Sequence, residues 1–367
     1  MVRNHFISFF WIVISSLVLG ACSSNTSETI DEIVITGAYC LDFSLVDSEL
    51  VITNSTTSGT YNIQFNDFDG GENSGSGTGS FSNNILTING IYTIASGTGN
   101  FIGSLTHNAT TNSFDGTFSI VDPQGNTLIT STLIAKKGNC NYTLTPNQLN
   151  QVIGQPYLTS LHVELDKIKK ISRYRSAAGH NFIDYSGESC VNLKHYFHTY
   201  PEGMITSTTP LPSSLKYYAP ADGTIVNITQ TRVSEDPTDY EVDIRLTANE
   251  NVIIRIFHIT PKSGLSVGDI VSSGEEIATA PTAHLDSGDF AVYVLTTGGY
   301  RHLSMFEIMS PAVMQVYIDK GISANWKQDL YYETTDPYVS GIFCENGTWG
   351  NLRHPSSNFE LDFYIFN

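Results

Sequence analysis

The second half of the chain contains the stretch Ala219-Pro220-Ala221-Asp222-Gly223-Thr224-Ile225-Val226, a turn that leads into a β-branched run. Two further runs of strand composition follow at residues 240–246 and 252–259. A stretch with regularly placed glycines comes next, over residues 264–277. Because glycine tolerates the backbone angles of tight hairpins, this pattern predicts strands that fold back on a small twisted sheet.

Two helices are expected at the edge of that sheet. Leucine and isoleucine recur at helical spacing over residues 158–171, opposite a charged side, which predicts an amphipathic helix. Ser310-Pro311 is typical of a helix start and Gly321 of a helix end, which predicts a second helix between them.

Residues 34–140 differ in composition, with many Gly, Ser, Thr and Asn and with short alternating runs between turn clusters. The clearest hairpin joins residues 116–121 to 127–135 through the turn 122–126. This spacing is typical of an antiparallel sandwich or small barrel. The Gly/Ser run 70–80 is expected to be a mobile loop, and the domain itself an adhesive or spacer module.

The sequence therefore predicts a mainly β protein in two parts. An N-terminal β sandwich or barrel, residues 34–140, is followed by a linker at 141–150. The second part, residues 151–367, is a β domain with a few peripheral helices and a C-terminal extension rich in aromatic residues.

The N-terminus has the features of a bacterial lipoprotein signal. Arg3 precedes an apolar run at residues 6–19, too short for a comfortable membrane span, and Leu19-Gly20-Ala21-Cys22 closes it. We expect cleavage after residue 21, a lipid on Cys22, and a polar tether over residues 22–33. The absence of an acidic residue at Ser23-Ser24 favours the outer membrane of the cell envelope, with the inner membrane as the alternative.

The chain is acidic, with a formal net charge of −18, and loss of Arg3 with the signal makes the mature chain one unit more negative. Such a field repels nucleic acid and other polyanions at long range. Nucleic-acid binding is therefore excluded as an expected function.

Four cysteines remain besides Cys22, an even number that predicts disulfides in an oxidising compartment. We favour the pairs Cys40 with Cys140 and Cys190 with Cys344, because each pair brackets one compositional half. Four free thiols are the alternative.

The best chemical signal is His180 with Asp184, a His-x-x-x-Asp pair on an extended segment. Such a pair offers a nitrogen and an oxygen to zinc from one face of a strand. The alternative is a histidine that is hydrogen-bonded to a carboxylate in a former active site.

Two families share the glycine-punctuated β pattern. The first, the biotinyl or lipoyl carrier domains, needs a lysine at a hairpin tip several residues before the Ala-Pro, whereas Lys216 stands only three residues before Ala219. The order of segments over residues 176–294 instead resembles the lysostaphin-type (LytM-like) zinc endopeptidases, which cleave peptide cross-links of bacterial walls. The matching segments are His180 to Asp184, Asp222-Gly223, His258 and residues 267–274.

What the resemblance implies for the site depends on the last motif strand of that family, His-x-His. Here Ser287 stands at the catalytic histidine and Asp289 at the third metal ligand. The resemblance therefore implies a Zn²⁺ site of His180, Asp184 and Asp289, with His258 as the catalytic base or anion stabiliser. His284, His195 and His198 are further candidates, the last two expected to be solvent-facing loop residues.

Two functions follow from this resemblance. The first is a cell-envelope lipoprotein, held to the membrane by the lipid on Cys22, whose peptidase-like domain has lost hydrolysis and binds, scaffolds or regulates. Its partner would be peptidoglycan or an envelope protein. The alternative is an active zinc-dependent hydrolase that cleaves peptidoglycan peptides or another envelope substrate. The loss of the His-x-His pair favours the first.

Overall fold

The computed structural model describes residues 33–41, 48–67, 74–94, 97–122, 124–138, 144–176, 179–180, 193–199, 211–230, 236–282, 287–297, 299–328, 351–352 and 363–366. The predicted signal segment and Cys22 lie outside these ranges, as do Cys140, Cys190 and Cys344. Among the helices of the described ranges, none has the length and apolar character needed to cross a membrane.

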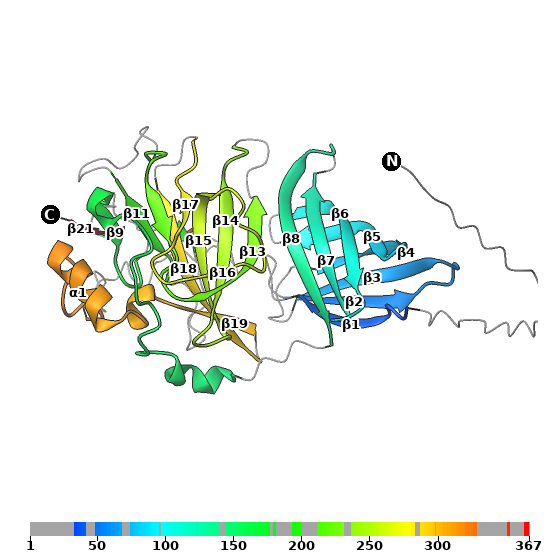
Figure 1. Cartoon of the computed structure of the whole chain (residues 1–367), viewed down its shortest axis with the longest axis horizontal. Helices are drawn as coiled ribbons and strands as arrows, with labels where there is room; N and C mark the ends of the chain where they lie inside the picture. Colours follow the sequence, from blue (N-terminus) through cyan, green and yellow to red (C-terminus); the bar gives the residue numbers. More distant parts are fainter. Residues whose placement is uncertain are drawn as a thin grey trace, which may run out of the picture. The chain divides into compact units, whose positions relative to one another are not determined.

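The N-terminal part is a closed antiparallel barrel of eight strands (Figure 1). Each strand pairs with the next, and β1 closes the barrel on β8 through Cys40↔Lys136 and Leu41↔Ala135. Of the two architectures expected from the sequence, the barrel is the one observed. Its strands are β1 Gly37–Leu41, β2 Ser48–Asn54, β3 Thr60–Asp67, β4 Ser74–Ser82, β5 Ile85–Ile94, β6 Gly97–Asn108, β7 Ser113–Val121 and β8 Thr127–Lys137.

The predicted hairpin at residues 116–135 is confirmed by β7 and β8. Its turn is held by Asp122, whose Oδ1 accepts hydrogen bonds from the backbone N–H groups of Gln124 at 2.9 Å and Asn126 at 2.8 Å. A carboxylate that caps its own turn in this way fixes the hairpin register.

The expectation of a mobile loop over residues 70–80 is wrong for residues 74–80, which belong to strand β4; residues 70–73 lie outside the described ranges. Glycine is needed at Gly75 and Gly77 because neighbouring atoms leave no room for a Cβ. A Cβ at Gly75 would come within 2.8 Å of the Tyr92 side chain, and one at Gly77 within 2.0 Å of the backbone oxygen of Asn89. Gly77 also faces Gly90 directly across the strands. The composition therefore reflects close packing of strand on strand.

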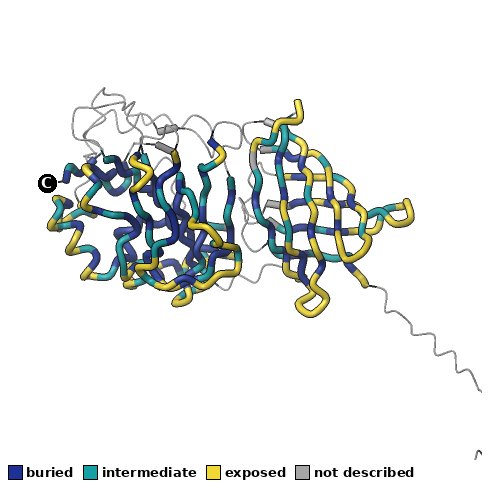
Figure 2. The backbone as a smooth tube through the Cα atoms, turned by 45° about the horizontal axis from the view of Figure 1, so that its top comes forward, coloured by how far each residue is buried: buried dark blue, intermediate teal, exposed yellow. Residues whose placement is uncertain are grey.

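Buried residues alternate with exposed or half-buried ones along the barrel strands, as Figure 2 shows, and most of the large buried side chains are apolar. Four aromatic rings pack together, those of Phe65, Tyr92, Phe101 and Phe118. The centroid of the Phe65 ring lies 5.1 Å from that of Phe101 and 5.3 Å from that of Phe118. Burial of rings on this scale is a large share of the stabilisation of a small barrel.

The second half is built on antiparallel strands in the order β13-β14-β15-β18, with β11, β9 and β21 continuing from β18. Strand β13 also pairs with β8 of the barrel through Thr229↔Ser131. The elements are η1 Pro146–Gln151, η2 Leu165–Lys167, β9 Lys170–Ser172, β10 Gly179–His180, β11 His195–His198, β12 Lys216–Tyr218, β13 Gly223–Gln230, β14 Tyr240–Leu246, β15 Val252–Pro261, β16 Ile270–Val271, β17 Glu276–Thr279, β18 Gly288–Thr296, β19 Gly299–Leu303, η3 Met305–Glu307, α1 Pro311–Lys320, β20 Asn351–Leu352 and β21 Phe363–Ile365.

The helix expected after Ser310 is confirmed as α1. The Ser310 hydroxyl accepts from the backbone N–H of Val313 at 3.3 Å, and Gly321 ends the helix with a φ of 125°. A left-handed φ of this kind suits glycine alone.

The helix expected over residues 158–171 is not formed. That segment contains only the short η2 and the strand β9, where Ile171 pairs with Phe197 on one side and Tyr364 on the other. Leu158, Leu165 and Ile171 are all buried. The apolar spacing therefore identified residues that are buried in the core. The backbone of β9, however, forms its hydrogen bonds with β11 and β21 and not within a helix.

Strand β18 positions the candidate site, because it is buried along its whole length. Phe290, Val292 and Val294 face the main core, and Ala291, Tyr293 and Leu295 face a smaller cluster that includes Phe257. Asp289 falls on the second face by the period-two rule of strands. A carboxylate thus lies at the end of a buried apolar row.

Candidate functional site

Asp289 lies between two neighbouring strands, opposite Phe257 of β15 and Tyr196 of β11. Its side chain is 2% exposed, and its Oδ2 lies 2.6 Å from the Nζ of Lys194, which is 5% exposed. The Lys194 ammonium also lies 3.7 Å from the centroid of the Phe257 ring. In a buried ion pair each charge is stabilised mainly by the other, and here the Phe257 ring also stabilises the ammonium. Both side chains are therefore held in place.

His258 joins this pair from a bulge in β15. The register with β14 shifts between Tyr240↔Ile259 and Val242↔Ile256, which leaves an extra residue, and His258 has a φ of 57°. The left-handed region costs a non-glycine residue about 1 kcal/mol or more. The bulge re-aims the imidazole, so that its Nε2 lies 3.5 Å from Asp289 Oδ2.

Asp239 holds the other side of the His258 ring. Both carboxylate oxygens lie 3.1 Å from Nδ1, and the residue is fully buried. Asp239 is placed by a turn in which Asp236 Oδ1 accepts from the N–H and the hydroxyl of Thr238, at 2.8 and 2.7 Å. Lys194, Asp239, His258 and Asp289 are called the ionic cluster below.

The protonation of His258 follows from its neighbours. Burial disfavours the imidazolium, but the hydrogen bond to Asp239 and the negative charges of Asp289 and Asp239 outweigh burial and the Lys194 charge, so the pKa of His258 is raised. An imidazolium between two carboxylates, one of which carries an ammonium, balances the charge of the cluster.

Tyr217 borders the ionic cluster from strand β12. Its ring is fully buried, and a Cβ at Gly288, next to Asp289, would come within 2.6 Å of the Tyr217 hydroxyl oxygen. Burial, with the charges of Asp289 and Asp239, raises the pKa of this hydroxyl far above its ordinary value. Tyr217 therefore stays a neutral phenol. Glycine at position 288 leaves room for this hydroxyl and for the Phe197 ring, which a Cβ would approach to 2.4 Å.

A second charged group lies on the neighbouring strands β14 and β15. Arg255 donates from Nε and Nη2 to Asp243 at 2.7 and 2.8 Å, and its Nη1 lies 3.5 Å from Glu241. Asn227 donates to the same Asp243 carboxylate at 2.9 Å and accepts from Ser131 at 2.8 Å. Bidentate pairing of this kind fixes geometry, so this group has the character of a structural network.

The structure brings together two of the residues singled out from the sequence, His258 and Asp289. For His180 only the backbone is described, where it pairs with Asn351. Its side chain and the whole of Asp184 lie outside the described residues, as does His284. The expected zinc ligand set of His180, Asp184 and Asp289 therefore stays a prediction.

His195 and His198 are not the solvent-facing loop residues expected, since both are buried in strand β11. His195 Nδ1 lies 3.0 Å from the backbone oxygen of Ser172, and Nε2 lies 2.7 Å from the Ser304 hydroxyl. Burial lowers the pKa of His195 to about 4, although the bond to Ser172 opposes the shift. One ring nitrogen thus links β11 to β9, and the other links β11 to Ser304, the residue that caps η3.

The residues missed from the sequence are Lys194 and Asp239. The run 194–198 contains two histidines, but Tyr196 pairs with Asp289, so the period of two puts Lys194 on the Asp289 face and His195 on the other. The alternation of side chains between the two faces of residues 194–198 was the sequence signal that could have identified Lys194. Asp239 gave none, because it belongs to a turn far from any motif.

The donors of the ionic cluster do not fit a zinc centre. Asp289 Oδ2 is held by an ammonium group, which has three donors and no lone pair to offer a metal. His258 Nδ1 is directed at Asp239, not at a shared point with other ligands. In the described part of the chain, no three His, Cys, Asp or Glu side chains are arranged to hold a metal ion. The ionic cluster therefore consists of an ion pair, Lys194 with Asp289, and a hydrogen-bonded pair, His258 with Asp239.

Comparison with known proteins gave structural likenesses only. No protein-family model matches the sequence, and no curated protein matches it. The chain is similar to a zinc-containing peptidase from Vibrio cholerae, with 12% identity, a TM-score of 0.26, and 66% of this chain and 54% of that chain covered. It is also similar to Helicobacter pylori Csd3 in two crystal forms.

For Csd3 the orthorhombic form gives 11% identity, a TM-score of 0.29 and coverage of 72% of this chain and 50% of that one. The hexagonal form gives 10% identity, a TM-score of 0.27 and coverage of 88% of this chain and 61% of that one. The chain thus spans about half to three fifths of these proteins. TM-scores of this size do not establish a shared fold.

Proposed function

We propose that this chain is a bacterial envelope lipoprotein whose C-terminal part is a LytM-like peptidase domain that no longer hydrolyses and acts in binding, scaffolding or regulation. The observation that carries the proposal is the Lys194 ammonium on Asp289. By the sequence resemblance, Asp289 stands at a zinc-ligand position. A carboxylate in a 2.6 Å ion pair with a buried lysine is unsuited to that role, because binding a metal would require the ammonium to leave.

The charge balance of the ionic cluster supports the same proposal. Each charged group has an oppositely charged neighbour, Lys194 with Asp289 and His258 with Asp239. A working hydrolase leaves an open position for water and a base that faces it. Here the Nε2 of His258 faces a carboxylate at 3.5 Å. The arrangement stabilises a resting structure and leaves little driving force for proton abstraction.

In this proposal the lipid on Cys22 anchors the protein to the outer membrane, and the partner is peptidoglycan or an envelope protein. The acidic charge of the chain makes a cationic or neutral partner surface the better match.

The alternative, an active hydrolase, is favoured by one observation. His258 is held in a left-handed conformation in a β-bulge and is backed by Asp239, an orientation device that catalytic histidines use. A zinc ion on His180 and Asp184 would supply Lewis-acid chemistry there.

The test is incubation of the mature lipoprotein with purified peptidoglycan sacculi. Soluble peptide-bearing fragments are measured over time by mass spectrometry, and sedimentation measures binding. We expect co-sedimentation with no time-dependent release, and no effect of a chelator. Release that a chelator stops and that Asp289→Asn abolishes, while the barrel variant Thr117→Ala does not, would establish the hydrolase instead.

A further inference from the structure

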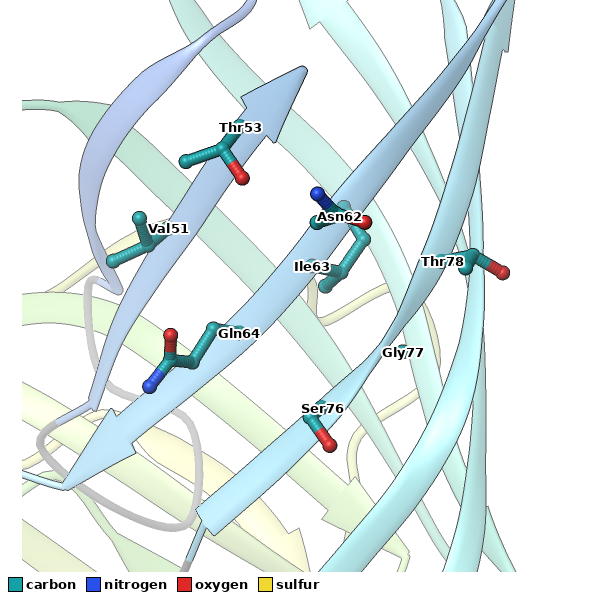
Figure 3. Close-up of a pocket in the computed structure, with 8 residues that line it drawn as sticks. All are labelled: Val51, Thr53, Asn62, Ile63, Gln64, Ser76, Gly77 and Thr78. Atoms are coloured by element: carbon teal, nitrogen blue, oxygen red, sulfur yellow. The ribbon is translucent and has the colours of Figure 1, made fainter. Parts of the chain in front are cut away.

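A groove lies on the barrel wall over the three neighbouring strands β2, β3 and β4, as Figure 3 shows. Its volume is about 420 Å³, within the range of small-ligand sites. It belongs to no part of the ionic cluster. The lining residues are Val51, Thr53, Asn62, Ile63, Gln64, Ser76, Gly77 and Thr78.

The strand register arranges the polar side chains of this groove in two rows. Thr53, Asn62 and Thr78 are direct cross-strand partners, and so are Val51, Gln64 and Ser76. Neighbouring strands are about 4.8 Å apart, so the first row presents three hydrogen-bonding side chains at that repeat, and the second presents two, Gln64 and Ser76, beside the aliphatic Val51. Asn62, Gln64, Ser76 and Thr78 are exposed. The Asn62 amide nitrogen also donates to the backbone oxygen of Asn54 at 3.2 Å, which orients its Oδ1 and leaves that oxygen as the group offered to a ligand.

The groove is held by regular structure. Strands β3 and β4 pair without interruption from Thr60↔Ser80 to Phe65↔Gly75. Gly77, at its floor, faces Gly90 so closely that no Cβ fits there. A site on paired strands keeps its geometry without a ligand, which lowers the entropic cost of binding.

The chemistry of the lining selects the ligand. None of the eight lining residues is charged, although the chain carries a net charge of −18. A charged ligand would lose hydration without gaining a counter-charge, and an anion would also meet the repulsive field of the chain. A wholly apolar ligand would bury amides and hydroxyls without partners. A neutral ligand with many hydroxyl groups satisfies both constraints.

An apolar neighbour adds a second property. Ile91 pairs directly with Ser76 and is 58% exposed, so the edge of the groove offers an aliphatic side chain beside the amide and hydroxyl rows. A sugar ring has the same two characters, with hydroxyls at its rim and C–H groups on its faces.

A peptide is the less suitable occupant. Extended peptides bind sheets by adding a strand to a free edge. Strands β2, β3 and β4 are interior strands of a closed barrel, each paired on both sides. Only side chains are therefore available in this groove, and a peptide backbone has no strand to pair with.

We propose that this groove binds a neutral, polyhydroxylated glycan chain. Gln64 donates and accepts through its amide, Asn62 accepts through its Oδ1, Thr53, Ser76 and Thr78 act through their hydroxyls, and Ile91 contacts a sugar face. The proposal rests on the barrel alone and is independent of whether the C-terminal domain hydrolyses anything.

The experiment uses the full mature lipoprotein in micelles of a sugar-free detergent. Saturation-transfer NMR and calorimetry measure binding of three probes, namely chitotetraose, maltotetraose and the anionic tetragalacturonate. We expect at least one neutral tetrasaccharide to bind, with a dissociation constant of about 0.1–10 mM because the groove is shallow, and tetragalacturonate not to bind.

Variants at exposed positions place the binding. Gln64→Ala should weaken binding about two- to tenfold, the value of one hydrogen bond. Ser76→Arg should abolish it by filling the groove, whereas Thr117→Arg, an equally exposed change on β7, should leave it unchanged. The proposal is overturned if neither neutral probe binds at about 10 mM, if tetragalacturonate binds as well as they do, or if Ser76→Arg binds like the native protein. Binding of a peptide control in the groove would also overturn it.

Discussion

The ammonium of Lys194 lies 2.6 Å from the carboxylate of Asp289, and both side chains are almost fully buried. The two residues are far apart in the sequence and meet because β11 pairs with β18 at Tyr196↔Asp289. Burying such a pair costs desolvation energy. Removing either partner leaves the other charge buried without compensation, which destabilises the fold.

Lys194→Met is expected to lower the free energy of unfolding by about 3–5 kcal/mol, because it leaves the Asp289 carboxylate buried without its ammonium. Denaturant unfolding measures this loss. The double variant Lys194→Met with Asp289→Leu should recover most of it. The matched control is the surface pair Lys320 with Asp166, in which the carboxylate is 93% exposed, and Lys320→Met should change stability little. A loss below about 1 kcal/mol in Lys194→Met would mean that the ion pair is not formed.

The raised pKa of His258 has a consequence for the pH dependence of stability. A histidine whose pKa is higher in the folded than in the unfolded chain stabilises the fold fully below the unfolded value, about 6.5. That contribution is lost as the pH rises through the folded pKa. NMR titration of the His258 ring measures the pKa, and Asp239→Asn should lower it, because the hydrogen bond to Nδ1 loses its charge. An unchanged pKa in that variant would contradict the assigned role of Asp239.

Gly77→Ala is expected to destabilise the barrel by about 1–3 kcal/mol, since its Cβ would come within 2.0 Å of the Asn89 backbone oxygen. Thermal unfolding measures the effect, with the exposed Ser80→Ala on the same strand as the control. If both variants unfold alike, the close approach of β4 and β5 is not as described.

The disulfide between Cys40 and Cys140 stays a prediction, because Cys140 lies outside the described residues. Tyr39 bridges to Gly138, and the Gly138 N–H donates to the backbone oxygen of Ala38 at 2.8 Å, so Gly138 lies beside β1, the strand that contains Cys40. A bond there would join the first and last strands of the barrel. Peptide mapping without reduction should find Cys40 linked to Cys140, and a link from Cys40 to Cys190 or Cys344 would contradict the pairing.

Much of the fold was predictable because its signals are local. The turn Asp122 to Asn126, the strand Tyr240–Leu246 and the helix between Ser310 and Gly321 each depend on residues adjacent in the sequence. The segment 158–171 was mispredicted because its backbone pairs with two strands from elsewhere in the chain. The glycines of β4 were taken for a loop because the groups that crowd them, rings at Gly75 and backbone at Gly77, lie on other strands.

The candidate site was predictable only in part, for the same reason. A motif placed His258 and Asp289 in one site, and the structure brings them within 3.5 Å. Lys194 and Asp239 carry no motif, and their roles arise from strand register and from a bulge at His258. Electrostatic partners supplied by tertiary pairing are invisible to spacing rules.

The zinc content of the purified mature protein tests the central claim most directly, measured by elemental analysis after dialysis against zinc and then against metal-free buffer. If Lys194 holds Asp289 and the domain is not a zinc hydrolase, the protein retains well below one zinc per chain, and His180→Ala retains the same amount. One zinc per chain that disappears in both His180→Ala and Asp289→Asn would contradict the account, because Asp289 would then be a metal ligand and not the partner of Lys194.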